Sequence, residues 1–405
     1  MATMSKASQC TLVCSKSEEF KVAPQQKNAW FQFLKSIASF KGDLSSLTAP
    51  PFLLSTTSLT EYSTYWAEHP SLLVAPAKES DPEKRALLVL RWFLSTLKEQ
   101  HNSKDEAGRK KKMKPLNPFL GELFLGKWED AEGTTKLVTE QVSHHPPATA
   151  FKVENSRHGV RLQGHISPKA YFSGTVHIER KGYAMLHIDE YNEDYLITMP
   201  KMHLEGILTG SIVTELSGSS TIRSSSGYTA QIEYSGKGWI GGAKNSFNAK
   251  LFHDGNLEKA LYTLDGQWSC AMNIKNTRTK ETAIFDARTL TRTPISIAPI
   301  EKQGPMESRR AWQNVAAAID AGDIFAVGQE KSKIENAQRD LRRREQAEGR
   351  EFQRRYFKKV EHDAVAEALA KGIKGIEGDM IGNGAGFWVW DEDKVRERSD
   401  SGVFV

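Results

Sequence analysis

The chain has 405 residues, of which 39% are hydrophobic and 26% charged, a composition typical of a folded protein. Its formal net charge of +5 is too small to indicate nucleic-acid binding, although it is compatible with an anionic ligand or an anionic membrane surface. The three cysteines, Cys10, Cys14 and Cys270, are too few for a disulfide framework and indicate a reducing compartment. No stretch contains the roughly 20 apolar residues that a membrane-spanning helix needs, so we expect any membrane contact to be peripheral.

The chain begins with an irregular tail followed by an amphipathic segment. Residues 1–26 are polar, with no long apolar stretch and no glycine at position 2, so we expect disorder, no signal peptide and no myristoylation. In 27–49, bulky apolar side chains recur at helical spacing: Trp30, Phe31, Phe33, Leu34, Ile37 and Phe40. This spacing predicts a short helix that either packs on a core or docks on a membrane, and the pattern alone favours the core.

The next segment, 50–117, is expected to be mainly helical. Leu59–Trp66 and Pro82–Gln100 carry apolar residues three and four positions apart, as one face of a helix requires. A charged loop follows, in which we expect Arg109–Lys112 to be solvated, with a weak attraction to anionic membranes.

A long β region occupies 118–304. Its apolar and polar residues mostly alternate in short runs, which Gly, Asn, Ser and Asp separate. The expected strands are Phe119–Trp128, Lys136–Val142, Ala148–Val153, Val160–Ile166, Thr175–Ile178, Ala184–Ile188, Tyr195–Met199, His203–Thr214, Thr229–Tyr234, Ser246–Phe252 and Ala260–Cys270. So many short strands predict a large antiparallel sheet or barrel. Gly236–Gly241 matches Gly-x-Gly-x-x-Gly, but strands flank it and no helix follows, so we expect a turn or bulge instead of a dinucleotide site.

Helices return in the last part of the chain, 305–405. Ser308–Ala326 fits one helix, and Glu330–Lys359 fits a second helix that is long and highly charged. The Gly-rich stretch 372–386 is expected to be a loop. Trp388–Trp390 is expected to pack back onto the protein.

The most informative stretch is Glu140–Pro147, with the sequence EQVSHHPP. The two prolines stiffen the backbone, so His144 and His145 are held at the end of a predicted strand. We weigh a metal site and a catalytic site against an anion site. Adjacent histidines on an extended chain point apart, no ligands follow at zinc spacing, and no nucleophile elbow is present. An anion site fits best, because imidazoles donate N–H groups and a nearby phosphate favours their charged form.

Two further groups of charged side chains are candidates for the same kind of site. Lys114 precedes Pro115 and lies close to Pro118, so it is a fixed cation just before the first strand of the β region. On the predicted charged helix, three residues at i, i+4 and i+8 share one face: Lys331, Glu335 and Arg339. Taken alone, they indicate a ladder of surface ion pairs worth a few tenths of a kcal/mol each.

The octapeptide also resembles a family signature, that of the oxysterol-binding-protein-related lipid-transfer proteins. The other matching strings are Phe33–Phe40, Trp66–Pro70, Lys114–Glu122 and Glu307–Trp312. The resemblance runs from about Trp30 to Trp390 and is strongest to short fungal members of the Kes type, which consist of the lipid-binding domain alone.

The resemblance implies an α+β fold dominated by β structure, namely a near-complete, large antiparallel β barrel that encloses an apolar lipid tunnel. An N-terminal lid in 27–49, a helical segment in 50–117 and a C-terminal helical subdomain in 305–405 would flank the barrel, all within one lipid-binding domain. It also reverses the interpretation of the amphipathic helix. Its six apolar residues would close the tunnel and contact loosely packed membranes.

The resemblance further implies which residues meet the ligands. The head group of phosphatidylinositol 4-phosphate would contact Lys114, Asn117, His144, His145, Lys331 and Arg339, with Glu335 ordering the last two. Positions that line the tunnel for sterol correspond to Trp30, Leu44, Trp66, Gln100, His101 and Ile166. Ile166 and Arg180 stand where the sterol-binding pattern has amides, so the second lipid is either a sterol or another lipid.

The function implied by the resemblance is non-vesicular transfer of lipids between membranes, with phosphoinositide and sterol bound mutually exclusively in one tunnel. We expect a monomer without cofactor, metal or nucleic-acid partner, located in the cytoplasm and peripherally on endoplasmic reticulum, Golgi or other membranes. One alternative is a trafficking regulator that binds phosphoinositide without moving lipid in bulk. An enzyme is the third option, and the sequence offers it no activated nucleophile.

Overall fold

The structure, a computed structural model, describes residues 20–40, 42–44, 47, 49–100, 114–236, 243–373, 376, 380 and 386–394, without the side chains of residues 20, 99 and 100. The expectations for residues 1–19 and for the basic loop Arg109–Lys112 lie outside these ranges. Residues 20–26 are expected from the sequence to be irregular, but they contain two short elements. Phe20–Lys21 forms strand β1, which pairs with β11, and Pro24–Gln26 forms a 3-10 turn.

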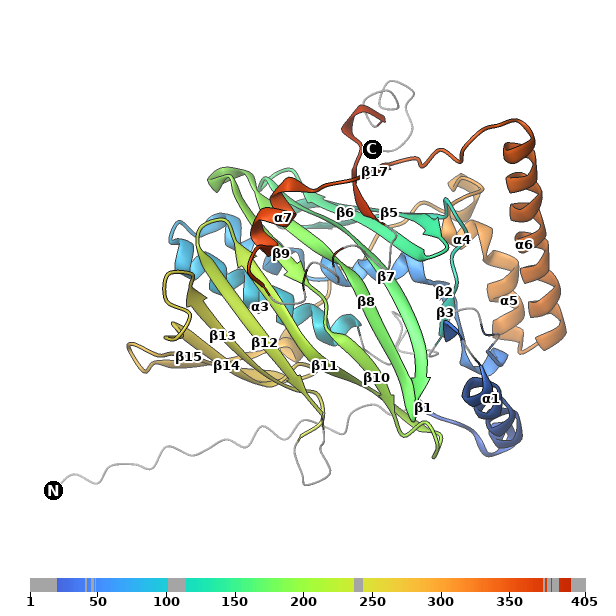
Figure 1. The fold of residues 1–405 in the computed structure, drawn as a ribbon, viewed down its shortest axis with the longest axis horizontal. Helices are drawn as coiled ribbons and strands as arrows, with labels where there is room; N and C mark the ends of the chain where they lie inside the picture. The colour runs from blue at the N-terminus through green and yellow to red at the C-terminus, as the bar shows by residue number, and fades with distance from the viewer. Residues whose placement is uncertain are drawn as a thin grey trace.

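One large antiparallel sheet dominates the molecule (Figure 1). In the described residues its strand order is β16-β15-β14-β13-β12-β11-β10-β8-β7-β6-β5-β4, with β1 and β9 paired alongside β11. Beyond β1, its strands are β4 Leu123–Asp130, β5 Gly133–His144, β6 Pro147–Asn155, β7 Val160–Ser173, β8 Thr175–Ile188, β9 Glu193–Thr198, β10 Lys201–Glu205, β11 Ser211–Ser224, β12 Tyr228–Ser235, β13 Ser246–His253, β14 Tyr262–Gln267, β15 Ala271–Asn276 and β16 Thr282–Asp286. The predicted antiparallel sheet is therefore confirmed.

Three strand predictions are wrong in their boundaries. Thr175–Ile178 and Ala184–Ile188 belong to the single strand β8, because β7 pairs with the whole intervening stretch. His203–Thr214 is instead two strands, β10 and β11, which a tight turn separates. Gly206 and Gly210 adopt φ values of 69° and 72° in this turn, a conformation that favours glycine.

The sheet curves into a barrel whose edge is covered by the chain that follows β16. The Lys127 N–H of β4 donates to the Ser296 carbonyl at 2.9 Å, and the Ser296 N–H donates back at 2.7 Å. The Leu123 N–H donates to the Met306 carbonyl at 2.9 Å. These bonds satisfy backbone groups at the edge of β4. In the described residues no ladder joins β4 to β16, so the barrel is nearly complete but not closed.

Helices pack inside and beside the barrel. Helix α3, Pro82–Gln100, contributes fully buried Leu90 and Phe93 to the largest core cluster, which also contains barrel residues such as Leu186. The 50–117 segment is less helical than expected. Leu54–Ser58 is strand β2, which pairs in parallel with β3, Lys114–Leu116, and other parts of it form short helices: η3 Pro51–Leu53, η4 Leu59–Trp66, α2 Pro70–Val74 and η5 Ala75–Lys78.

The C-terminal helices differ from both predictions. The expected helix Ser308–Ala326 is wrong, because α4 Ser308–Ala311 and α5 Gln313–Ala321 are followed by Gly322 at φ 71°, which ends the helix. A new helix, α6 Ile324–Ala347, then begins with the Asp323 carboxylate accepting the Ala326 N–H at 2.9 Å. The predicted helix Glu330–Lys359 is also wrong, because α6 ends at Ala347 and the last residues of the predicted range belong to strand β17, Phe357–Val360.

The end of the described chain packs back onto the protein. Strand β17, Phe357–Val360, pairs with β18, Phe387–Trp390, so Trp388–Trp390 folds back as predicted. Between them, helix α7 spans Ala364–Ala370. Within the described ranges, no helix combines the length and apolar character needed to cross a membrane.

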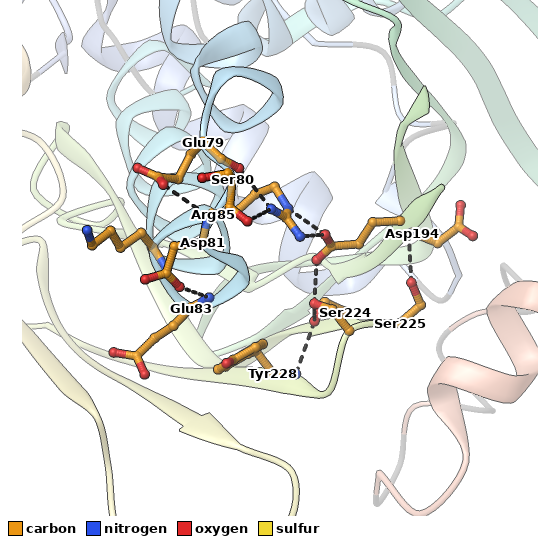
Figure 2. Close-up of polar contacts among 12 residues, drawn as sticks. Glu79, Ser80, Asp81, Glu83, Arg85, Asp194, Ser224, Ser225 and Tyr228 are labelled. Atoms are coloured by element: carbon orange, nitrogen blue, oxygen red, sulfur yellow. Dashed lines mark hydrogen bonds and ion pairs between the residues drawn. The ribbon is translucent and has the colours of Figure 1, made fainter. Parts of the chain in front are cut away.

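A buried ion pair ties α3 to the barrel. The Arg85 guanidinium meets the Glu193 carboxylate at the start of β9, and both side chains are almost fully buried, with 5% and 3% exposed. Figure 2 shows Arg85 also donating to the backbone carbonyls of Glu79 and Ser80, at 2.8 and 3.1 Å. The cation is therefore satisfied on several sides, which buried charges require.

We expect Arg85→Met to lower the free energy of unfolding by about 3–5 kcal/mol, because it leaves the Glu193 carboxylate buried without its cation. Urea unfolding followed by circular dichroism measures this change. The matched control Lys84→Met, at an exposed position one residue earlier, should change the free energy by less than about 0.5 kcal/mol. Equal losses in the two variants would contradict a special role for the ion pair.

Candidate functional site

An apolar cavity of about 320 Å³ lies between the N-terminal helix α1, Lys27–Ser39, and the inner face of the barrel. Strand register explains which side chains face it. Pro168 lies opposite Arg180 and Ala170 opposite Ile178, so alternate residues of β7 and β8 point inward. The barrel strands contribute Thr149, Ile166, Pro168, Ala170, Val176, Ile178, Arg180, Met202, Leu204 and Ile212 to the lining.

Helix α1 covers this cavity with one face and exposes the other. Trp30 and Ile37 are each 3% exposed, and the Trp30 Nε1–H donates to the Ile207 carbonyl at 3.1 Å. Phe33 also lines the cavity, and Leu34 is half-buried in the same cluster. Phe31 and Phe40 point outward, at 55% and 37% exposed. The helix is therefore a cover with Phe31 exposed on its outer face and Phe40 exposed directly after its last residue.

The paired histidines lie at the turn between β5 and β6. His144 is the last residue of β5, as expected for a strand end. Their side chains do not point apart, however, because the chain turns at His145 and brings the ring centroids to 4.4 Å. Burial, followed by the neighbouring His145, lowers the pKa of His144, although the Pro118 carbonyl and the Glu335 carboxylate oppose this shift. The free protein thus holds His144 mainly neutral at pH 7.

Lys114 lies where the cavity meets the linker that follows α1. Its amine donates to the Leu47 carbonyl, and both residues line the cavity. Burial, together with the nearby Lys331 charge, lowers the pKa of Lys114 to about 8, while Asp43 acts in the opposite direction. Asp43 is itself fixed to the barrel, since its carboxylate accepts the Ala170 N–H at 3.1 Å. An anion bound close by would relieve the repulsion between Lys114 and Lys331.

Helix α6 brings the remaining charged residues to the same place. Lys331 lines a small cavity of about 120 Å³ together with Lys114 and Asn117. Glu335 contacts Lys331 at 3.7 Å and Arg339 at 3.6 Å, so the predicted ladder on one helical face is confirmed. Arg339 remains 62% exposed, and its described contacts are with Glu335 and Asn336 of its own helix.

The other residues of the octapeptide hold the turn in position. The Glu140 carboxylate accepts the backbone N–H groups of Arg355 and Tyr356 and thereby fixes the chain that precedes β17. The Gln141 side chain accepts from the Thr149 hydroxyl at 2.6 Å and donates to the Ser143 carbonyl at 2.8 Å. The motif therefore combines a pair of imidazoles with the polar groups that orient the backbone carrying them.

The predicted tunnel residues are only partly brought together. Trp30, Leu44 and Ile166 line the cavity as expected. Trp66 lies outside this lining, because its ring packs in the main core with Trp92 and Phe151 at 5.7 and 5.6 Å between centroids. The Gln100 side chain and the whole of His101 lie outside the described residues.

Two residues near the site were missed by the sequence analysis. Arg342 acts electrostatically on His144, and helical spacing could have found it, since it lies eleven positions after Lys331 on the same face. Its guanidinium also stacks 4.3 Å over the Phe352 ring. Asp43 had no signal of this kind, because its contacts with β7 and Lys114 depend entirely on tertiary structure.

The arrangement can bind an amphiphile with an anionic end. Its mouth offers the amines of Lys114 and Lys331 and the Asn117 amide, while the interior is mainly aliphatic and aromatic. The His144 imidazole is an electrostatic neighbour of Glu335 on the same helix as Lys331. Among the described residues, no group of three or more His, Cys, Asp or Glu side chains could hold a metal ion. The donors suit a phosphate with charge-assisted hydrogen bonds, which are stronger than neutral ones.

Comparison with known proteins identifies the family. The family model described as oxysterol-binding protein matches residues 30–319. The chain belongs to the oxysterol-binding protein family. Protein kes1 of Schizosaccharomyces pombe is 46% identical to this oxysterol-binding protein over 355 residues, which cover 86% of this chain and 91% of the relative.

Solved structures of oxysterol-binding proteins share the fold. The Osh1 ORD domain in complex with ergosterol superposes with a TM-score of 0.67 at 18% identity, covering 94% of this chain and 98% of that domain. The Osh3 ORD in complex with PI(4)P from Saccharomyces cerevisiae gives a TM-score of 0.61 at 20% identity, covering 85% and 90%. The barrel architecture is therefore that of this family.

The Lys114 amine is expected to titrate near pH 8 in the free protein, because of burial and the Lys331 charge. Lys331→Gln should raise this pKa by removing a neighbouring positive charge, and Asp43→Asn should lower it by removing a negative one. Competitive acetylation across pH, read by mass spectrometry, measures both changes. Labelling of Lys169, an exposed lysine on the outer side of β7, should be the same in all variants. Unchanged titration of Lys114 would contradict its placement beside α6.

Proposed function

We infer that this oxysterol-binding protein carries phosphatidylinositol 4-phosphate and a second lipid, with a sterol as the first candidate, and moves them between membranes. The observation that carries the inference is the continuity of two cavities through Lys114 and Asn117. These residues line both the apolar cavity under α1 and the smaller cavity beside Lys331, whose other lining residues are mostly apolar. Acyl chains would occupy the apolar space, and the phosphorylated head group would meet the amines of Lys114 and Lys331 where the two cavities join.

Two similar proteins support the choice of ligands. One solved neighbour is a complex with ergosterol and another is a complex with PI(4)P. The site residues expected for the head group agree with the geometry to different degrees. Lys114, Asn117 and Lys331 share a cavity, and His144 is an electrostatic neighbour of Glu335 on the helix that carries Lys331. The His145 ring lies 4.4 Å from that of His144, and Arg339 would need to change rotamer to reach a phosphate.

Mutually exclusive binding follows from a single cavity under a single cover. Both lipids would occupy the space that Trp30, Phe33 and Ile37 close. The Lys114 amine already donates to the Leu47 carbonyl of the linker after α1, so a phosphate must compete with or extend that contact. Exchange would therefore be coupled to movement of the lid and its linker.

We propose that the protein acts as a monomer in the cytoplasm, as one lipid-binding domain, and reaches endoplasmic reticulum, Golgi or other membranes peripherally through the lid. Exposed Phe31 and Phe40 would insert into loosely packed lipid. No covalent chemistry or cofactor is required for such exchange. The rival function, a phosphoinositide-dependent regulator, would use the same site with slow exchange, so transfer rates compared with binding affinities separate the two.

We expect His144→Ala/His145→Ala and Lys114→Ala to reduce extraction of phosphatidylinositol 4-phosphate from liposomes at least tenfold, because each removes charge-assisted hydrogen bonds to phosphate. Extraction is measured by flotation with labelled lipid. His253→Ala and Lys169→Ala, which remove exposed side chains of the same types elsewhere on the barrel, are the matched controls. Full extraction by the site variants would refute the head-group assignment.

Phe31→Ser should weaken binding to loosely packed vesicles about tenfold, since it removes the apolar area that would enter the membrane. Affinity for a lipid presented in detergent should stay unchanged, because Phe31 faces away from the cavity. Vesicle co-sedimentation measures the first quantity. The control Leu257→Ser removes an apolar side chain that is 46% exposed at another place and should leave vesicle binding intact. An equal loss in both variants would argue against docking through the lid.

A further inference from the structure

The cavity under α1 has a second charged residue that the head-group site does not use. Among the described lining residues, only Lys114 and Arg180 are charged, and both are cations. Arg180 follows Val176 and Ile178 on the inward row of β8. Val176 belongs to the core cluster of the lid residues Trp30 and Ile37, and four residues of strand place Arg180 about 13 Å further along. Arg180 therefore lies toward the inner end of the cavity.

The surroundings of Arg180 are polar but provide no carboxylate in the described lining. Its Nε–H and one Nη–H group donate to the Pro200 carbonyl, each at 3.3 Å. Tyr65 and Tyr234 are its electrostatic neighbours, and burial lowers the pKa of the guanidinium. The Tyr234 hydroxyl bonds to Ser220 at 3.1 Å. The guanidinium thus lies beside the Pro200 carbonyl and the phenols of Tyr65 and Tyr234.

Tyr65 supplies an independent sign that a ligand atom belongs here. Its side chain lines the cavity, the residue is only 7% exposed, and its hydroxyl has no hydrogen-bond partner among the described residues. A buried hydroxyl without a partner costs about 1–3 kcal/mol. The Thr149 hydroxyl, which also lines the cavity, is bonded to Gln141, to which it donates at 2.6 Å. A ligand oxygen that accepts from both Tyr65 and Arg180 would satisfy this end of the cavity.

We propose that Arg180 and Tyr65 form an acid-selective site, and that the second lipid is an apolar molecule whose buried end carries an anionic group such as a carboxylate or sulfate. A guanidinium can donate hydrogen bonds but cannot accept them, so it pairs best with an acceptor of negative charge. Folding already removes part of the hydration of Arg180, which is half-buried, so an incoming anion gains the attraction at a reduced cost. This assignment rests on the proposed function, since it specifies the second ligand of the same cavity.

The test compares acids with alcohols that share the same apolar body. Equilibrium binding of tritiated cholesteryl sulfate is compared with cholesterol, and oleate with oleyl alcohol, at pH 7.5. We expect at least a tenfold preference for the acid in one pair, and the pair that shows it identifies a sterol or an acyl chain as the body. Equal affinities within both pairs, or a preference for both alcohols, would overturn the proposal without any substitution being needed.

Variants then assign the preference to a residue. Arg180→Gln should reduce the acid-to-alcohol ratio at least tenfold, and Tyr65→Phe should reduce it several-fold. Lys169→Gln, which removes a positive charge from the outer side of the adjacent strand, should leave the ratio unchanged. If Lys114→Gln abolishes the preference and Arg180→Gln does not, the acid binds at the mouth and the proposal is wrong.

Extraction of phosphatidylinositol 4-phosphate is measured on the same preparations. Arg180→Gln should reduce it less than Lys114→Gln does, because Arg180 lines the part of the cavity proposed for acyl chains and Lys114 the part proposed for the phosphate. A lost acid preference together with this smaller loss of extraction supports the proposal. If the unsubstituted protein extracts no phosphoinositide, the proposed function fails, and the acid-to-alcohol ratio still decides the chemistry of the inner site separately.

Discussion

A fully buried carboxylate, that of Glu122, joins the parts of the chain from which the site is built. It accepts hydrogen bonds from the Thr60 hydroxyl at 2.8 Å, the Trp312 indole at 2.7 Å and the Phe119 N–H at 3.3 Å. Burial raises the pKa of Glu122, and side-chain hydrogen bonds from Ser58, Trp312, Thr60 and Ser308 counter the shift. Since a buried acceptor without donors is costly, the short helix η4, the entry to the barrel and the C-terminal helices are held in one arrangement.

The proposed head-group site is a consequence of this arrangement. Lys114 lies a few residues before Glu122, and α6 follows Trp312, so fixing these segments places Lys114 next to Lys331. Burial, and after it the repulsion by Lys331, lowers the pKa of Lys114. An anion between them would relieve that repulsion, and it would also favour protonation of His144. Phosphate binding between Lys114 and Lys331 would therefore be electrostatically favourable.

The lid is connected to the same charges. Asp43 bonds to the backbone of β7 and acts on Lys114, while Lys114 donates to the Leu47 carbonyl. The linker that follows the lid helix is therefore in contact with Lys114, which is proposed to bind the head group. At the other end, Arg180 gives the cavity a second polar site, so the chemistry of a bound lipid can be tested at both of its ends.

Local patterns in the sequence correctly predicted several elements of the structure. Alternation of apolar and polar residues predicted the antiparallel sheet, helical spacing predicted α1 and the face shared by Lys331 and Glu335, and EQVSHHPP marked a histidine pair at a strand end. These signals are local, because each depends on residues within one or two turns or along one strand. The family resemblance, which the comparisons confirm, rests on the same short strings.

The contacts between these elements could be seen only in the tertiary structure. It brought the His144 and His145 rings together at a turn, placed Trp66 in the main core instead of the cavity lining, and ended the first C-terminal helix at Gly322. It also brought Asp43 to Lys114 and turned Arg180 inward. Contacts between residues distant in the chain depend on strand register and on packing between elements, and neither is encoded in local periodicity.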